Sequence, residues 1–160
     1  MALKWKKSDL MTLAEKKVQM ANETCQSMIY AGIDVQLTTG SEHFSLEPND
    51  QTNIDSMFTA VTLGATQYPY HSDGNQCTMY SAADIFTLYV AYKTFVTKQT
   101  TYCNFLKIWI NREPDKDVLA GIVYGSDLPE DLNAEMEVIL AQAAEEIQAI
   151  IGKMQQTMGA

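Results

Sequence analysis

Residues 81–111 read SAADIFTLYVAYKTFVTKQTTYCNFLKIWIN and predict the longest helix of the chain. Ser81 is a good helix N-cap, and Asp84 follows three residues later in an arrangement close to a capping box. Apolar and aromatic residues then recur at helical spacing and cover more than one face of the helix. A helix that is apolar on several sides is buried among other elements. We therefore expect residues 82–111 to form the spine of the core.

A helix and a β-hairpin are predicted at the start of the chain. The helix has a capping residue at Ser8 or Asp9, and Gly32 ends it in the manner typical of a helix C-terminus. Apolar and polar residues then alternate over residues 33–37 and again over residues 42–46, which is typical of half-buried strands. The turn between them, over residues 38–41, completes a hairpin.

A second helix and hairpin are predicted before the central helix. Pro48 suits an early helical position and Gly64 ends the helix. The expected core face of this helix consists of Ile54, Met57, Phe58, Val61 and Leu63. Asp73-Gly74 then lies between two aromatic-rich runs, which is a strong hairpin signal. Pro69 places its strand at the edge or start of a sheet.

Two further helices are predicted after the central one. Pro114 breaks the helical pattern, Asp115 starts a short helix that ends at Gly125, and Pro129 begins a helix that extends to about Met158. Acidic residues flank the apolar stripe of this last helix. The stripe consists of Leu132, Met136, Ile139, Leu140, Ala143, Ile147, Ile150, Ile151 and Met154.

These patterns predict an α+β fold with a helix–β-hairpin–helix–β-hairpin–long helix core and an appended C-terminal amphipathic helix. Three regions are expected along the chain. Residues 1–21 form an N-terminal arm and the start of the first helix, residues 22–125 form the α+β domain, and residues 126–160 carry the amphipathic helix.

Composition narrows the class of partner. The chain has 160 residues, with 20 acidic against 11 basic ones and a net charge of -9. Such a charge repels phosphate backbones and anionic lipids, so we expect no nucleic-acid partner and no membrane partner. Cys25, Cys77 and Cys103 form no CxxC pair, which favours free thiols in a reducing cytosol. Lysines interrupt the first apolar residues, so no signal peptide is predicted.

Two kinds of chemistry were weighed from the residue types. His43 or His71 could serve a cysteine nucleophile, but Cys103 lies in an aromatic helical run that predicts a buried, inert thiol. The same histidines with Cys77 and Cys103 could bind zinc, although their spacing lacks the close ligand pairs of structural zinc sites. Phosphate-binding glycine motifs are missing from the sequence. We expect a protein without enzymatic activity, cofactor or metal.

Two segments are candidates for contact with partner proteins. The first holds Trp5, Lys6 and Lys7, in which an aromatic residue flanked by lysines resembles an interface anchor. Trp5 packing back onto the core of the protein is the equally weighted alternative. The second is the last helix, which either packs on its own chain or joins a bundle with a copy or a neighbour. Its candidate contact residues are Leu132, Met136, Ile139, Ile147, Ile150 and Met154.

Residues 22–125 also resemble a domain family from tail modules of phages and prophages of Gram-positive, Clostridium-like bacteria. The resemblance covers about two thirds of the chain. It rests on Cys25, Ile29-Tyr-Ala-Gly-Ile-Asp-Val, Thr39-Gly-Ser-Glu-His-Phe-Ser-Leu, Asp50-Gln-Thr-Asn-Ile, Tyr70-His-Ser-Asp-Gly, Cys77, Tyr80-Ser-Ala-Ala-Asp, Thr100-Thr-Tyr-Cys-Asn, Trp109-Ile, Ile122-Val-Tyr-Gly and Leu128-Pro-Glu.

The resemblance implies a biological setting. Members of that family are encoded beside baseplate and tail-fibre proteins, so the chain is expected to be a virion tail or baseplate component made in a bacterial cytoplasm. Its expected partners are other tail, baseplate or fibre proteins, with a homo-oligomer through the C-terminal helix as a further option. A tail-fibre assembly chaperone, absent from the mature particle, is the alternative. An enzyme acting on the host surface would need a set of catalytic residues that the sequence does not offer.

Overall fold

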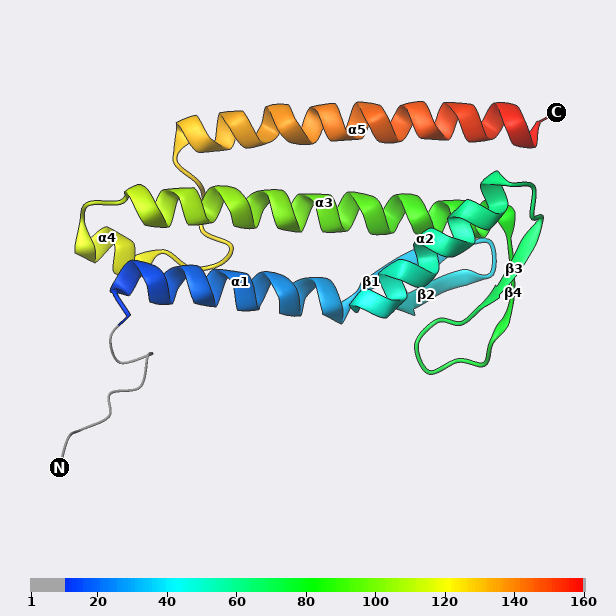
Figure 1. The fold of residues 1–160 in the computed structure, drawn as a ribbon, viewed down its shortest axis with the longest axis horizontal. Helices are drawn as coiled ribbons and strands as arrows, with labels where there is room; N and C mark the ends of the chain where they lie inside the picture. The colour runs from blue at the N-terminus through cyan, green and yellow to red at the C-terminus, as the bar shows by residue number, and fades with distance from the viewer. Residues whose placement is uncertain (1–10, 160) are drawn as a thin grey trace.

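The structure is a computed structural model that describes residues 11–159. Figure 1 shows three long helices side by side in one layer, with two β-hairpins and a shorter helix gathered at one end. The element order confirms the predicted α+β class. In chain order the elements are α1 (Leu13–Ala31), β1 (Ile33–Leu37), β2 (Gly40–Phe44), α2 (Pro48–Thr62), β3 (Gln67–Tyr70), β4 (Thr78–Ser81), α3 (Ala82–Arg112), α4 (Lys116–Gly121) and α5 (Glu130–Met158).

α1 begins later than predicted. Its N-cap is Thr12, whose hydroxyl accepts a hydrogen bond from the Glu15 N–H at 3.1 Å, while the Glu15 carboxylate accepts one from the Thr12 N–H at 2.9 Å. This reciprocal capping box satisfies two backbone donors that a helix start otherwise leaves unpaired. The prediction of a cap at Ser8 or Asp9 is therefore wrong.

Gly32 ends α1, as predicted, and its φ of 83° lies in the region that favours glycine. A Cβ atom on this residue would lie 2.0 Å from the carbonyl oxygen of Phe44. The end of β2 thus passes directly against the end of α1. Only a residue without a side chain fits this contact.

The hairpins are two separate antiparallel sheets of two strands each. β2 already starts at Gly40, so the first turn is shorter than the predicted turn over residues 38–41. Pro69 lies in a strand with a single paired neighbour, as an edge position requires. The loop of the second hairpin is tied to the first, because the Asp73 N–H donates to the His43 carbonyl at 2.9 Å. The Asp73 carboxylate also accepts hydrogen bonds from the N–H and the hydroxyl of Ser45.

Ser81 caps α3 as predicted, by accepting a hydrogen bond from the Asp84 N–H at 3.1 Å. The Asp84 side chain itself is buried at 4% exposure. Its carboxylate accepts hydrogen bonds from the N–H of Thr38 at 2.9 Å and from the Thr38 hydroxyl at 2.7 Å. Asp84 therefore fastens the turn of the first hairpin to the first turn of α3.

α2 packs on α3 through the core face predicted for it, with one exception. Phe58 stacks on Tyr89 of α3, with the ring centroids 3.6 Å apart. Leu63 was predicted in the core but is 83% exposed. The helix ends at Thr62, so the next residue leaves the helical path and its side chain turns to solvent. The buried residues of α2 are Ile54, Met57 and Val61.

One main apolar cluster joins the elements from α1 to α4, with Leu106 of α3 among its fully buried members, and it also includes Met154 near the end of α5. A second, smaller cluster consists of Phe105, Leu132 and Met136, between α3 and α5. α4 ends at Gly121, earlier than the predicted Gly125. Within residues 11–159, no helix is long and apolar enough to cross a membrane.

Candidate functional site

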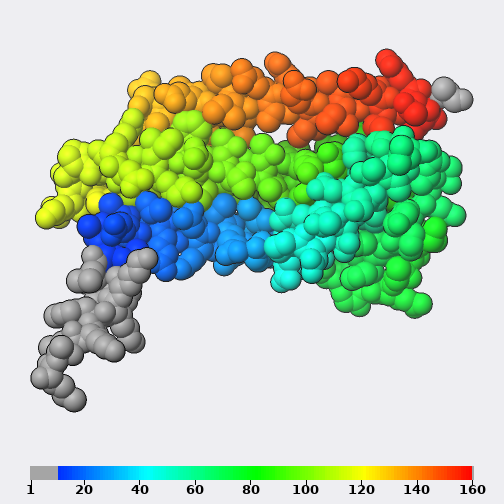
Figure 2. All heavy atoms as spheres, viewed as in Figure 1, coloured from blue at the N-terminus to red at the C-terminus, as the bar shows by residue number. Residues whose placement is uncertain are grey.

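α5 lies along one edge of the helical layer, with α3 between it and α1. It begins directly after Pro129, as predicted, and it packs antiparallel to α3. Figure 2 shows α5 as a ridge along that edge, in orange and red. Because α5 makes its main contact with a single helix, much of its surface remains open to a partner.

Seven positions of α5 recur at three- and four-residue steps and face α3. This spacing is typical of helices that pack at a small crossing angle. Three of the seven are buried: Leu132, Met136 and Met154. The four between Met136 and Met154 remain partly exposed: Leu140, Ala143, Ile147 and Ile150.

The contact between α3 and α5 is poorly filled in its middle. A cavity of about 270 Å³ is lined by Thr94 and Thr97 of α3 and by Ala143 and Ala144 of α5. A neighbouring cavity of about 210 Å³ extends to Ile150. Short side chains on both helices leave this space, which is open to solvent along the middle of the contact. α5 is therefore held mainly near its two ends.

One ion pair supports the start of α5. The two terminal nitrogens of Arg112 each donate to one carboxylate oxygen of Asp131 at 2.6 Å. These hydrogen bonds lower the pKa of the Asp131 carboxyl to about 2. Both side chains are largely exposed, and exposed ion pairs stabilise a fold only slightly. The ion pair therefore orients the start of α5 and contributes little to the stability of its attachment.

The outer side of α5 combines apolar and acidic residues. Val138 is 58% exposed and Ile139 is 44% exposed. Apolar side chains that are exposed beside charged ones are a feature of protein-contact surfaces. The acidic residues of this part of the helix are Glu135, Glu137, Glu145 and Glu146. Val138 does not belong to the predicted stripe, and its position opposite that stripe is the signal that would have identified it.

The contact residues predicted from sequence fall into three groups. Trp5, Lys6 and Lys7 lie outside the residues that the structure describes. Ile139 is exposed, whereas the others face α3, where they are buried or half-buried: Leu132, Met136, Ile147, Ile150 and Met154. In the structure α5 packs on α3 of its own chain. A bundle with a copy or a neighbour stays a prediction. Leu132, Met136 and Met154 become accessible to a partner only when α5 leaves α3, whereas Ile147 and Ile150 are already partly exposed.

The cysteine and histidine residues weighed for catalysis do not form a nucleophile–base pair. Cys103 is buried between α1 and α3, with its sulfur 3.7 Å from the Ala21 carbonyl oxygen. Burial raises the pKa of the Cys103 thiol to about 11, which keeps it protonated at neutral pH. The ring of His43, in the first hairpin, is instead bonded to Asp34 and to the Ala31 carbonyl, each at 2.7 Å.

The zinc arrangement is not formed either. His71 follows β3 and interacts with the Ser72 carbonyl at 3.3 Å, while Cys77 precedes β4 and is exposed. Among residues 11–159, no three His, Cys, Asp or Glu residues lie close enough together to hold a metal ion. A structural zinc site would need four such ligands.

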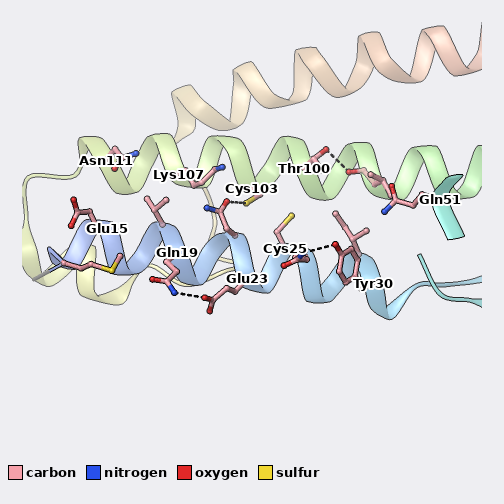
Figure 3. A pocket seen from close by; sticks show the side chains of 16 residues that line it. Glu15, Gln19, Glu23, Cys25, Tyr30, Gln51, Thr100, Cys103, Lys107 and Asn111 are labelled. Atoms are coloured by element: carbon pink, nitrogen blue, oxygen red, sulfur yellow. Dashed lines mark hydrogen bonds between the residues drawn. The ribbon is translucent and has the colours of Figure 1, made fainter. Parts of the chain in front are cut away.

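The largest groove, of about 840 Å³, lies between α1 and α3 (Figure 3) and was not anticipated from the sequence. Its walls combine polar and apolar side chains, and several polar groups on α1 bond to one another along the helix. Gln19 donates to Glu23 at 2.7 Å, and Gln26 donates to the Tyr30 hydroxyl at 2.8 Å. Figure 3 shows no set of side chains converging on one point in the groove. Its signal in the sequence is a polar row at four-residue spacing beside the apolar stripe of α1.

Comparison with curated proteins gives no match, and comparison with solved structures gives none. A family model matches residues 12–124, which is more than two thirds of the chain. The match includes every element from α1 to α4 and ends before α5. The chain therefore belongs to the family described as "Domain of unknown function (DUF4376)".

Proposed function

We propose that the protein is a non-enzymatic structural component of a phage tail or phage-like contractile particle, at the baseplate or the fibre attachment, and that it acts through protein–protein contacts. The resemblance of residues 22–125 to domains of phage tail modules supports the setting. The observation that carries the mode of action is α5. It lies beyond the family match, makes its main contact with one helix, and exposes Val138 on its outer side and Ile139 at the border of that side.

The charge of α5 supports a protein as its partner. Its 29 residues include six acidic side chains and one basic side chain, Lys153. A surface of this sign repels nucleic-acid phosphates and anionic lipid headgroups. Exposed valine and isoleucine side chains, in contrast, release water when another protein covers them. Proteins with basic and apolar contact residues suit this surface.

A tail-fibre assembly chaperone, absent from the mature particle, is the alternative. The poor filling of the α3–α5 contact favours it, since a helix held mainly near its ends can leave its neighbour. Release of α5 would expose the apolar stripe from Leu132 to Met154 for a client protein. The two functions therefore differ in whether the outer side or the inner stripe of α5 makes the contact.

Mass spectrometry of purified particles tests the proposal. The structural role predicts that the protein is present in stoichiometric amounts, whereas presence in the lysate and absence from particles would support the chaperone. The protein truncated after Leu128, and the protein lacking residues 1–7, are both expected to keep the central fold and to be lost from particles. Normal incorporation of both truncated proteins would contradict the proposed contacts.

A point variant refines this test. Val138→Glu adds charge to the outer side of α5 without touching its contact with α3, so we expect loss of incorporation with an unchanged unfolding midpoint. Val118→Glu is the matched control, because Val118 is an exposed valine on α4, 45% accessible and remote from α5. Equal incorporation of the two variants would mean that the outer side of α5 is not part of the interface.

A further inference from the structure

The outer side of α5 has a definite chemical character. Val138 is its exposed apolar residue and Ile139 lies at its border with the apolar stripe, while Glu135 stands one turn before them and Glu145 lies two turns beyond Val138 on the same side. Asp131 already has a basic partner in Arg112, whereas no hydrogen bond or ion pair within residues 11–159 engages the Glu135 or Glu145 carboxylate. The surface thus combines exposed apolar side chains with carboxylates that form no ion pair within residues 11–159.

The opposite end of the chain has the complementary composition. Residues 1–10 read MALKWKKSDL and contain three lysines against one aspartate. Leu3 and Trp5 alternate with Lys4 and Lys6, so apolar and basic residues are interleaved over a few positions. Such a segment offers apolar side chains to Val138 and Ile139 and ammonium groups to the carboxylates around them. It is the only stretch of the chain that combines a tryptophan with clustered lysines.

Chain length decides whether this pairing forms within one molecule. From Met11, Trp5 is six residues away, which spans at most about 21 Å when fully extended. α3 separates α1 from α5, so the axis of α5 lies about 16–20 Å from that of α1, with helices about 8–10 Å apart. The outer side of α5 lies about 5 Å further, and the chain would have to pass around two helices to reach it. A contact between Trp5 and that surface therefore requires a second copy of the chain.

We propose that residues 1–10 of one copy dock on the outer side of α5 of a second copy, with Trp5 against Val138 and Ile139 and the lysines against Glu135 and Glu145. The inference rests on the proposed function, for which it names one partner as the protein itself. The contact joins two different surfaces, so each copy keeps one free N-terminal segment and one free α5. Association continues to a ring or an open chain. Two α5 helices facing each other would instead bring acidic surfaces together.

Sedimentation velocity of the purified full-length protein tests this proposal. We expect the average mass to rise with protein concentration at about 0.1 M salt and to fall at about 1 M salt, where the screening length shrinks to about 3 Å. The variant Lys4→Glu/Lys6→Glu/Lys7→Glu and the variant Glu135→Lys/Glu145→Lys should each weaken association at least about tenfold. Mixing the two variants in equal amounts should restore it, because each then meets a surface of opposite charge.

The control variant is Glu23→Lys/Asp117→Lys, which makes the same change of net charge on α1 and α4 and should associate like the unmodified protein. Trp5→Ala should weaken association while leaving its salt dependence in place. A protein that remains monomeric at all concentrations would overturn the proposal, and so would a mixture of the charge variants that fails to associate. Self-association without incorporation into particles would support this inference and contradict the proposed function. Incorporation of a monomeric protein into particles would support the proposed function and contradict this inference.

Discussion

α1 and α5 both lie against α3, but they are attached to it in different ways. α1 places Ala21, Cys25 and Ile29 in the main apolar cluster. α1 is also bonded to α4 and to the residue that follows it. The Lys17 ammonium donates to the carbonyls of Ala120 and Ile122 at 2.6 and 2.7 Å. α5 has a small cluster near its start, a single buried residue near its end, and cavities between them.

This difference separates what stabilises the fold from what is available for binding. The elements from α1 to α4 share one core, so they are expected to unfold together. α5 contributes one buried residue, Met154, to that core and keeps an exposed apolar and acidic side. A helix that is attached in this way can be changed on its outer side, or lost, without unfolding the domain. We therefore expect stability to reside with α1 and binding to reside with α5.

The largest expected effect is the loss of a buried leucine from the main cluster. Leu106→Ala should lower the free energy of unfolding by about 4 kcal/mol, because Leu106 is fully buried and surrounded by several elements. Leu132→Ala, in the small cluster between α3 and α5, should lower it by about 2 kcal/mol, since α5, which carries Leu132, can shift toward α3 and close part of the gap. Urea unfolding followed by circular dichroism measures both. Equal losses would mean that α5 belongs to the same cooperative unit as α1.

Two glycine substitutions should change the free energy of unfolding in opposite directions. Gly32→Ala should destabilise the protein by at least about 3 kcal/mol, because it places a Cβ atom on the Phe44 carbonyl and strains a left-handed backbone. Gly152→Ala should stabilise α5 by about 0.5–1 kcal/mol, because Gly152 is helical and its Cβ would meet no atom within 4 Å. Thermal unfolding of the two variants tests the contrast. A stabilised Gly32→Ala protein would contradict the close contact between α1 and β2.

Asp84 and Asp131, each of which bonds to another element, should differ in their effect on stability at low pH. Burial acts to raise the pKa of Asp84, but hydrogen bonds from Thr38 and Ser81 outweigh it and the pKa is lowered. Its contribution is therefore present above the unfolded pKa of about 3.9 and is lost as the pH falls through the lower folded value. Asp84→Asn should cost about 2 kcal/mol at neutral pH and remove that part of the acid sensitivity. Asp131→Asn should have a much smaller effect, because its ion pair is exposed.

Much of the fold was predictable because its signals are local. Ser81, Gly32 and Pro129 mark helix boundaries through their own backbone chemistry, and each lies at the predicted boundary. The start of α1 was missed because several capping residues precede it, and only the pairing of Thr12 with Glu15 selects one. The hydrogen bond between Asp84 and Thr38 joins residues 46 positions apart, so no local sequence pattern predicts it.

The candidate site was less predictable, for a physical reason. An apolar stripe at helical spacing is the same whether a helix packs on its own chain or on a partner. The stripe of α5 therefore pointed to residues that its own α3 covers, and the exposed Val138 lay outside the pattern. The weak point of the α3–α5 contact depends on two small side chains meeting, Thr94 of α3 and Ala143 of α5. Which side chains face each other across two helices depends on the tertiary packing and cannot be predicted from the sequence of either helix.

Native-state hydrogen exchange of the full-length protein tests most directly whether α5 is a separate unit. We expect the amides in the middle of α5, around residues 140–150, to exchange through an opening that requires several kcal/mol less than global unfolding. The buried amides of α1, around Ala21 and Cys25, should exchange only when the whole domain unfolds. Protection of α5 equal to that of α1, at every denaturant concentration, would contradict the account.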